Sequence, residues 1–176
     1  FIFNVLNQEM AGLQENERQN LASLVKLMRR NLELAEHLCV TLTEELDFVR
    51  TFLELKQQSL GPDFRADISI APDVAPDRVQ LPSMLIQIPV ENALKHALKD
   101  KEGARRLCIT ILKTPRGTDI RITDNGGLKV IMQTIQILNQ KNRETIDVAI
   151  RNVPLEGGET GCCVAFGLPD HYDYSL

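Results

Sequence analysis

Tryptophan is absent from this chain of 176 residues, and only two tyrosines and six phenylalanines are present. An aromatic platform on which nucleic-acid bases could stack is therefore not expected. Basic residues are also few, with 20 Lys and Arg against 24 Asp and Glu, and the net charge of −4 argues against nucleic acid as a partner. No apolar run approaches the ~20 residues that a membrane-spanning helix needs.

The four cysteines lack the spacing of a metal site; they are Cys39, Cys108, Cys162 and Cys163. The two adjacent ones would point to opposite faces of a strand, which argues against a shared metal ion. We interpret all four as small apolar side chains, buried or half-buried, in a reducing compartment. The hydrophobic share of 43% and the charged share of 25% are typical of a folded globular protein.

Residues 1–60 contain no proline and a single glycine, and their apolar residues recur at helical spacing. One series runs from residue 21 to residue 35. A capping-box pattern from Thr41 to Glu44 opens a second helix, which Gly61 ends. This second helix carries two apolar stripes: Leu42, Leu46, Val49 and Leu53 in one, and Phe48, Phe52 and Leu55 in the other. The pattern predicts a helical hairpin that forms a four-helix bundle with a second copy, or one that packs on the rest of its own chain.

The pattern changes after Gly61, where apolar and polar residues alternate as in half-buried strands. We expect strands around residues 64–70, 107–112, 120–122, 145–152 and 162–168. Helices are predicted over residues 82–99, with Pro89 removing one backbone hydrogen bond, and over residues 128–142. The order of these elements indicates an α+β fold. A helical dimerisation domain over residues 1–60 precedes a two-layer α/β sandwich over residues 61–176, whose sheet is mostly antiparallel.

Residues 90–97 read Val-Glu-Asn-Ala-Leu-Lys-His-Ala, and a helical wheel divides them into two arcs. The apolar residues occupy one arc, and the other collects four polar side chains: Glu91, Asn92, Lys95 and His96. A carboxylate, an amide, an ammonium and an imidazole group therefore face the same side. Taken alone, such an arc is also typical of a solvated helix face with one ion pair between Glu91 and Lys95.

The sequence Asp124-Asn125-Gly126-Gly127 lies between a predicted strand and a predicted helix. A carboxylate at the end of a strand can accept a hydrogen bond from an exocyclic amine, and adjacent glycines let the backbone approach a flat ring or a phosphate. The start of the following helix offers unpaired N–H groups to phosphate. By itself, Asp-Asn-Gly is also a common turn sequence.

In this order and on this scaffold, the two motifs resemble the N box and the first glycine box of the GHKL ATP-binding fold. Residues 85–96 resemble in particular the LytS-type sensor histidine kinases, whose N box carries Leu-Gln-Pro-x-Val-Glu-Asn-Ala. The opening residues, Phe-Ile-Phe-Asn-Val-Leu-Asn, resemble the phosphoacceptor motif of that family, His-Phe-x-Phe-Asn-x-Leu-Asn. Residues 42–55 resemble its second dimerisation helix.

The resemblance implies that the chain binds ATP and Mg²⁺. Asn92 would hold Mg²⁺, and Asp124 with Gly126 would bind the adenine amine. The remaining ATP-binding candidates are Lys95 and His96, which would approach the phosphates, and Gly127 and Leu128, which resemble the end of the second glycine box.

The resemblance also implies transfer of the γ-phosphoryl group to a histidine on the dimerisation helix, and then to an aspartate of a response regulator. Glu91 would orient a water or aid proton transfer, and Asn4 would position a water that dephosphorylates the regulator. The implied partners are a second copy, through the N-terminal helices, and the regulator. The chain would be the cytoplasmic portion of a bacterial membrane protein whose membrane segments lie upstream.

Three departures from the family pattern accompany this resemblance. The acceptor histidine would immediately precede Phe1. Gly126 runs directly into Gly127, where relatives have a longer segment that forms the ATP lid. Cys162 follows Gly161, where many relatives have threonine. Because the histidine and the lid are missing from this sequence, we expect the fragment to be inactive alone. Two alternatives remain open: a degenerate, non-catalytic dimerisation scaffold, and a GHKL ATPase or protein-serine kinase without histidine chemistry.

Overall fold

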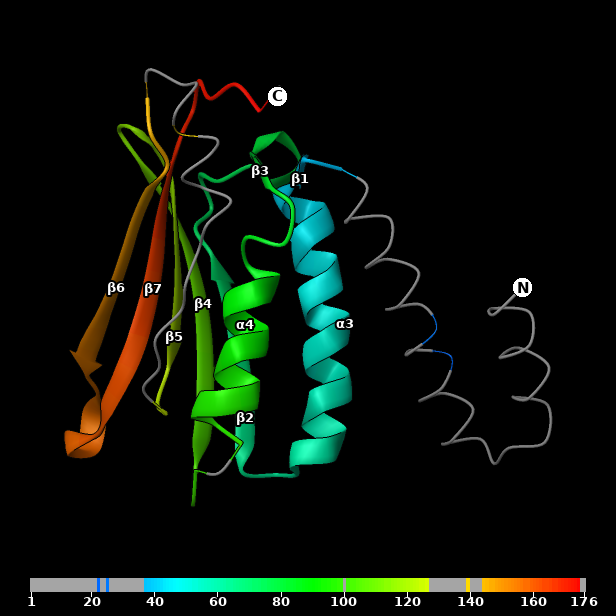
Figure 1. Cartoon of the computed structure of the whole chain (residues 1–176), viewed down its shortest axis with the longest axis vertical. Coiled ribbons are helices and arrows are strands. Elements are labelled where there is room, and N and C mark those ends of the chain that lie inside the picture. The colour runs from blue at the N-terminus through cyan, green and yellow to red at the C-terminus, as the bar shows by residue number, and fades with distance from the viewer. Residues whose placement is uncertain are drawn as a thin grey trace.

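Five strands form a mixed sheet with helices on one of its faces in the computed structural model of the chain (Figure 1). The structure describes residues 37–99, 101–126 and 144–174, together with Ala22, Val25 and Asn139. The α+β class predicted from the sequence is confirmed. The first helix of the expected hairpin and the expected helix over residues 128–142 lie outside the described residues, apart from those three positions.

The strand order of the sheet is β2-β4-β5-β7-β6. The strands comprise Phe64–Ile70 (β2), Arg105–Thr114 (β4), Gly117–Asp124 (β5), Asp147–Pro154 (β6) and Thr160–Pro169 (β7). β2 runs parallel to β4, and the other three pairs are antiparallel, so the predicted mostly antiparallel sheet is confirmed. Each expected strand is present, and several extend by two or three residues beyond the predicted ends.

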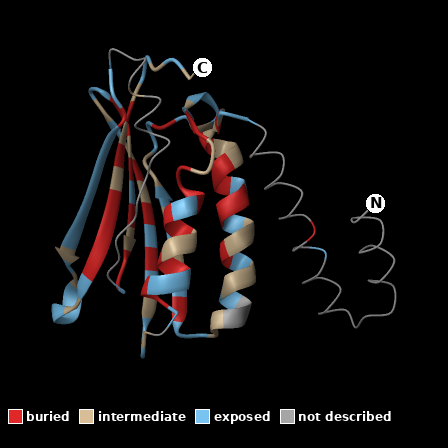
Figure 2. Cartoon of the chain, in the orientation of Figure 1, coloured by how far each residue is buried: buried red, intermediate tan, exposed pale blue. Residues whose placement is uncertain are grey.

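The alternation of apolar and polar residues along the strands defines the core face of the sheet. Leu107, Ile109 and Ile111 of β4 are buried, whereas Arg106 before them and Cys108 between them are exposed. Buried residues gather on this face and on the two helices beside it (Figure 2). Since each fully buried Leu, Ile or Phe contributes roughly 1.5–3 kcal/mol, this face supplies much of the driving force for folding.

Helix α3 (Leu42–Leu60) begins and ends where the sequence predicts. The Thr41 hydroxyl accepts a hydrogen bond from the Glu44 N–H at 3.2 Å, and the Glu44 carboxylate accepts one from the Thr41 N–H at 2.9 Å. This is the predicted capping box. At the other end Gly61, with φ of 79°, donates its N–H to the Gln57 carbonyl at 3.1 Å.

The first apolar stripe of α3 packs against other parts of the same chain. Leu42, Leu46, Val49 and Leu53 are buried within their own chain, in one core cluster with α4 and the sheet. Phe48 of the second stripe is buried in the same cluster, and Phe52 is half-buried. This stripe therefore packs on the rest of its own chain, and the four-helix bundle with a second copy stays a prediction. The physical reason is that apolar side chains preceding and within α4 need a cover, which α3 provides.

A second, two-stranded antiparallel sheet was not predicted. In it β1 (Cys39–Thr41) pairs with β3 (Gln80–Pro82). The short 3₁₀ turn η2 (Pro76–Arg78) lies just before β3 in the sequence. This sheet corrects the predicted start of the helix over residues 82–99, because Pro82 pairs with Cys39 in the ladder. Met84 then has a positive φ of 66°, a conformation that interrupts a helix.

Helix α4 therefore begins only at Gln87 and spans Gln87–Asn92, followed by the π-helical turn η3 (Ala93–Ala97). Pro89 lies in its first turn, between the hydrogen bonds from the Ile88 N–H to Met84 O and from the Val90 N–H to Ile86 O. The predicted loss of one backbone bond thus falls at the start of the helix. Within the described residues, no helix is both long enough and apolar enough to cross a membrane.

Candidate functional site

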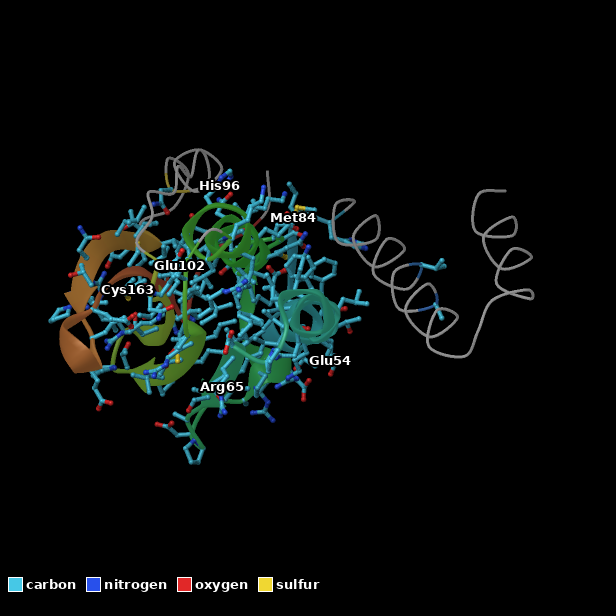
Figure 3. All side chains as sticks on the ribbon, turned by 90° about the horizontal axis from the view of Figure 1, so that it is seen from below. Glu54, Arg65, Met84, His96, Glu102 and Cys163 are labelled. Carbon is cyan, nitrogen blue, oxygen red and sulfur yellow. The ribbon has the colours of Figure 1, made fainter. Side chains whose placement is uncertain are left out.

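The polar arc predicted for residues 90–97 is present on α4 and η3. Val90, Ala93, Leu94 and Ala97 are buried in the core, as the helical wheel predicts. Glu91 and Asn92 are half-buried, whereas Lys95 and His96 are exposed. Figure 3 shows His96 on the outside of this helix. The helix therefore presents four polar side chains on the side that faces away from the core.

The turn η3 is wider than an α-helical turn. The Leu98 N–H donates to the Ala93 carbonyl, five residues back, at 2.8 Å. Such π turns are rare and occur frequently at functional sites. Lys95 and His96 both lie within it. Leu98 is fully buried, so the helix ends inside the core while the side chains of Lys95 and His96 remain outside.

Glu91 is oriented by neighbours on its own helix. Gln87 Nε2 donates to Glu91 Oε1 at 2.7 Å, and Lys95 Nζ lies 3.2 Å from Glu91 Oε2. The predicted ion pair between Glu91 and Lys95 is therefore present. Because the Lys95 side chain is 63% exposed, this pair contributes little stability, and its effect is to fix the direction of the carboxylate.

Asn92 differs from Glu91 because its side chain makes no hydrogen bond to any other residue that the structure describes. Its amide oxygen is therefore not occupied by a described protein donor. Mg²⁺ prefers oxygen ligands in proteins and usually keeps several waters, so one amide oxygen beside phosphate oxygens suits it. The donor set at Asn92 thus fits the Mg²⁺ role that the family resemblance implies.

Asp124 ends β5 as a buried carboxylate. Its side chain accepts the N–H of Gly126 at 2.8 Å, which closes the turn after the strand. In the sheet Asp124 lies opposite Cys162 of β7, and both residues are buried. The cysteine that replaces the family threonine therefore stands next to the candidate adenine residue.

Two glycines let neighbouring segments approach the Asp124 turn. A Cβ atom on Gly126 would lie 2.1 Å from the carbonyl oxygen of Ala97, and one on Gly161 would lie 2.1 Å from the carbonyl oxygen of Asp124. Only glycine permits such close backbone contacts. The Asp124 turn thus lies directly against the end of η3. The two motifs, 27 residues apart between Ala97 and Asp124, meet in the folded chain.

Asn125 is a residue whose role sequence reasoning missed. Its side chain accepts the N–H of Arg106 at 2.8 Å and donates to the Ala104 carbonyl at 2.9 Å and to the Glu159 carboxylate at 3.0 Å. Lys101 also contacts Glu159 at 3.0 Å. The hydrogen bond from Asn125 lowers the pKa of Glu159 most, and the one from Lys101 lowers it further. Asn125 therefore ties the Asp124 turn to β4 and to the β6–β7 connection.

Glu45 of α3 is the second residue that sequence reasoning missed. Its carboxylate is fully buried and accepts the backbone N–H groups of Met84, Ile86 and Gln87. Burial raises the pKa of this carboxyl group, and the three hydrogen bonds offset the rise only in part. A signal exists in the sequence, since Glu45 occupies an apolar position of the stripe, three residues after Leu42.

The remaining predicted site residues are Asn4, Gly127 and Leu128, and they lie outside the described residues. The four cysteines all lie within the described residues, and none forms a disulfide bond. Cys162 and Cys163 are buried and Cys39 is half-buried, as predicted, whereas Cys108 is exposed on the outer face of the sheet.

Comparison with known proteins gives a consistent set of relatives. A family model described as histidine kinase matches residues 1–64. Sensor protein LytS of Bacillus subtilis (strain 168) is 28% identical over 129 residues, which are 72% of this chain and 21% of that protein. Sensor protein LytS of Staphylococcus saprophyticus is 33% identical over 129 residues, again 72% of this chain and 22% of that protein. The chain thus spans about a fifth of the length of these curated relatives.

Solved structures resemble the chain in fold. The catalytic domain of histidine kinase ThkA superposes with a TM-score of 0.50, covering 77% of this chain and 97% of that one at 11% identity. The histidine kinase domain of the EL346 blue-light activated histidine kinase of Erythrobacter litoralis also gives a TM-score of 0.50. It covers 94% of this chain and 82% of that one at 12% identity. The likeness to these structures shows that the chain has the α+β fold of histidine kinase catalytic domains.

Proposed function

We propose that this chain, which belongs to the LytS-type sensor histidine kinases of the GHKL superfamily, is the kinase portion of a two-component sensor and binds Mg-ATP. One observation carries the proposal. Gly126 lies against Ala97 at a distance that only glycine allows, so the Asp124 turn and the Asn92 helix border the same region. A nucleotide between them would meet a carboxylate on one side and an amide oxygen with an ammonium and an imidazole group on the other.

The adenine end of the nucleotide would bind at the Asp124 turn. A carboxylate at the end of β5 can accept a hydrogen bond from the exocyclic amine of adenine, and Gly126 lets this turn lie directly against Ala97 at the end of η3. Cys162 lies opposite Asp124 and would offer a weakly hydrogen-bonding thiol where many relatives have the hydroxyl group of threonine. Gly127 and Leu128 remain candidates for the ATP contacts that the second glycine box makes in relatives.

The phosphate end would lie along the polar arc of α4 and η3. Asn92 supplies the amide oxygen that would hold Mg²⁺, which neutralises phosphate charge when bound. Lys95 and His96 are exposed and would approach the phosphates from the same side. Phosphoryl transfer depends mostly on positioning and charge neutralisation, so these side chains need only hold the γ-phosphoryl group in line with its acceptor.

The acceptor in the proposed reaction is a histidine on the first helix, and the phosphoryl group then passes to an aspartate of a response regulator. Glu91, whose direction is fixed by Gln87 and Lys95, would orient a water or aid proton transfer. Asn4 would position a water for dephosphorylation of the regulator. We further propose a homodimer through the N-terminal helices, and a cytoplasmic location within a bacterial membrane protein whose membrane segments lie upstream.

Two measurements test this function. Calorimetric titration of the chain with Mg-ATP should give saturable binding that Asp124→Asn weakens. A variant with a histidine added before Phe1 and a relative's lid segment inserted between Gly126 and Gly127 should then take up label from γ-labelled ATP as an acid-labile, base-stable phosphoryl group. Absence of Mg-ATP binding contradicts the proposal. Binding without transfer in the extended variant would instead favour the non-catalytic scaffold.

A further inference from the structure

Glu45 connects two helices through three hydrogen bonds. Its Oε2 accepts the Met84 N–H at 3.1 Å, and its Oε1 accepts the Ile86 and Gln87 N–H groups at 3.0 Å each. The donors lie 39 to 42 residues later in the sequence. A fully buried carboxylate on α3 therefore takes up the free backbone donors at the start of α4.

The start of α4 needs such a partner. The first N–H groups of a helix have no acceptor within the helix, and a negative charge near them is favourable. Ile86, the N-cap residue of α4, makes no side-chain capping bond. Met84 has a positive φ of 66°, which costs energy for a residue with a side chain and persists only where its surroundings hold it. Glu45 supplies both the missing acceptor and the restraint on Met84.

The contacts continue from Glu45 to the candidate site. Gln87, held at its backbone by Glu45, donates its side-chain Nε2 to Glu91 Oε1 at 2.7 Å. The Gln87 side chain is buried, and its Oε1 has no hydrogen-bond partner among the residues that the structure describes. Its orientation is thus set by Glu91 at one end and by its backbone position at the other. Asn92 follows Glu91 directly.

We propose that Glu45 is a positioning residue for the N-box helix: it holds the first turn of α4 from α3 and, through Gln87, sets the direction of Glu91 and the position of Asn92. The effect on Mg-ATP rests on the proposed function. Glu45 lies inside the segment 1–64 that matches the histidine kinase family, whereas α4 lies outside it. Any displacement of α3 along α4 breaks these three bonds. The position of α3 therefore affects the geometry of the candidate Mg²⁺ site through one buried side chain, Glu45.

Glu45→Gln is the first test, because it keeps the shape of the side chain and one carbonyl oxygen but replaces the other oxygen by an NH₂ donor. Two variants on the same helix serve as controls. Thr41→Ala removes the N-cap of α3 without removing a bond to α4, so it controls for a general loss of stability. Glu54→Gln removes an exposed carboxylate on the side opposite Met84 and His96, so it controls for charge (Figure 3).

Hydrogen exchange measures how strongly the backbone N–H groups at the start of α4 are protected, and it needs no nucleotide. We expect the amides of Met84, Ile86 and Gln87 to exchange at least about tenfold faster in Glu45→Gln than in Thr41→Ala. Exchange in Glu54→Gln should match the wild type. Unchanged exchange at these three amides in Glu45→Gln overturns the proposal, whether or not the chain binds ATP.

Calorimetry with two ligands separates positioning from a general structural effect. Glu45→Gln should lower the affinity for Mg-ATP about tenfold and leave the affinity for adenosine within about twofold, because adenosine uses only the Asp124 side. An equal loss for both ligands would show a structural role alone and overturn the positioning role. If the wild type binds neither ligand, the proposed function fails, and hydrogen exchange still decides whether Glu45 holds α4.

Gln87→Met tests the second step independently, including the case in which Glu45→Gln does not fold. It keeps the backbone N–H bonded to Glu45 and removes only the side-chain bond to Glu91. Mg-ATP affinity should fall while exchange at Ile86 stays as in the wild type. The double variant that combines Glu45→Gln with Gln87→Met should lose less Mg-ATP affinity than the product of the two single-variant factors, because both substitutions act on Glu91. Unchanged Mg-ATP affinity in Gln87→Met overturns the relay through this residue.

Discussion

At the scale of single residues, Asp124 combines burial, a position at the end of a strand and a close contact with the polar helix. Adenine presents an amine where guanine presents a carbonyl, so this carboxylate should favour ATP over GTP by roughly 1–3 kcal/mol. Asp124→Asn should weaken ATP binding and reduce the discrimination, as measured by competition calorimetry. Asp67→Asn, an exposed carboxylate on β2, is the matched control. Equal affinity of the wild type for the two nucleotides would argue against the assignment.

Asn92 should affect the binding of Mg²⁺ and not the binding of adenine. Its side-chain oxygen has no partner among the described residues, and alanine is well tolerated in a helix, so Asn92→Ala should fold normally. We expect the Mg²⁺ dependence of ATP affinity to fall by roughly tenfold, with binding in the presence of a chelator unchanged. Titrations with and without Mg²⁺ measure both values. A loss that is the same in both conditions would assign Asn92 to another role.

Glu45 should also be visible in the pH dependence of stability. Burial raises its pKa above 4.5, so the folded chain binds this proton more tightly than the unfolded chain. The free energy of unfolding then falls as the pH rises from 4.5 through the raised folded value. Relative to Glu45→Gln, the wild type should therefore be more stable at pH 4.5 than at about pH 7.5, as measured by urea unfolding. If the difference in unfolding free energy between the wild type and Glu45→Gln does not change with pH, the pKa of this carboxyl group is the same in the folded and unfolded chains.

Residue types near the site could be predicted from the sequence, but their partners could not. Asn92 and Asp124 stand in motifs whose spacing is local, so a helical wheel and a strand end suffice to identify them. Glu45 and Asn125 act through partners 19 to 42 residues away, and no local pattern fixes such pairs. The only signal for Glu45 was a charged residue on an apolar stripe.

At the scale of secondary-structure elements, the contact between the Asp124 turn and η3 depends on Gly126. A methyl group there would lie 2.1 Å from the Ala97 carbonyl oxygen, so Gly126→Ala must displace one of the two segments. Overpacking of this kind typically costs about 1–3 kcal/mol, and nucleotide affinity should fall with it. Gly167→Ala is the control, because its Cβ would meet Asp147 at an ordinary 3.5 Å. Urea unfolding and calorimetry measure the two effects, and equal behaviour of both variants would contradict the close contact.

The ends of elements were predictable only where local chemistry determines them. The capping box and Gly61 fix both ends of α3 within a few residues, so the sequence was sufficient. The start of α4 depends on the pairing of Pro82 with Cys39, more than 40 residues earlier, and on the acceptor that α3 supplies. A helical pattern over residues 82–99 carries no information about that pairing, and it therefore predicted the helix five residues too early.

At the scale of the whole molecule, the core extends from α3 across Gly61 into the sheet. Val49→Asp places an unpaired charge at a fully buried position and should cost roughly 3–5 kcal/mol. Because the stripe belongs to the shared core, helix and sheet should lose stability together in one transition, monitored by circular dichroism during urea unfolding. Thr51→Asp on the half-exposed side of the same helix should change little. A variant whose sheet remains folded after α3 is lost would show that the sheet does not depend on α3 and would support the predicted division at residue 60.

The continuity of this core has a consequence for recombining sensor and kinase modules. Gly61 looks like a natural joint in the sequence, but a chimera spliced there would bring a foreign helix to a domain whose helical cover over the core, acceptor for the start of α4 (Glu45) and partner strand for β3 (β1) all come from upstream. Splicing before Cys39 keeps these parts together. Inputs from other receptors should therefore be grafted onto the segment that precedes β1, and exchanges of α3 should succeed only when α4 is exchanged with it.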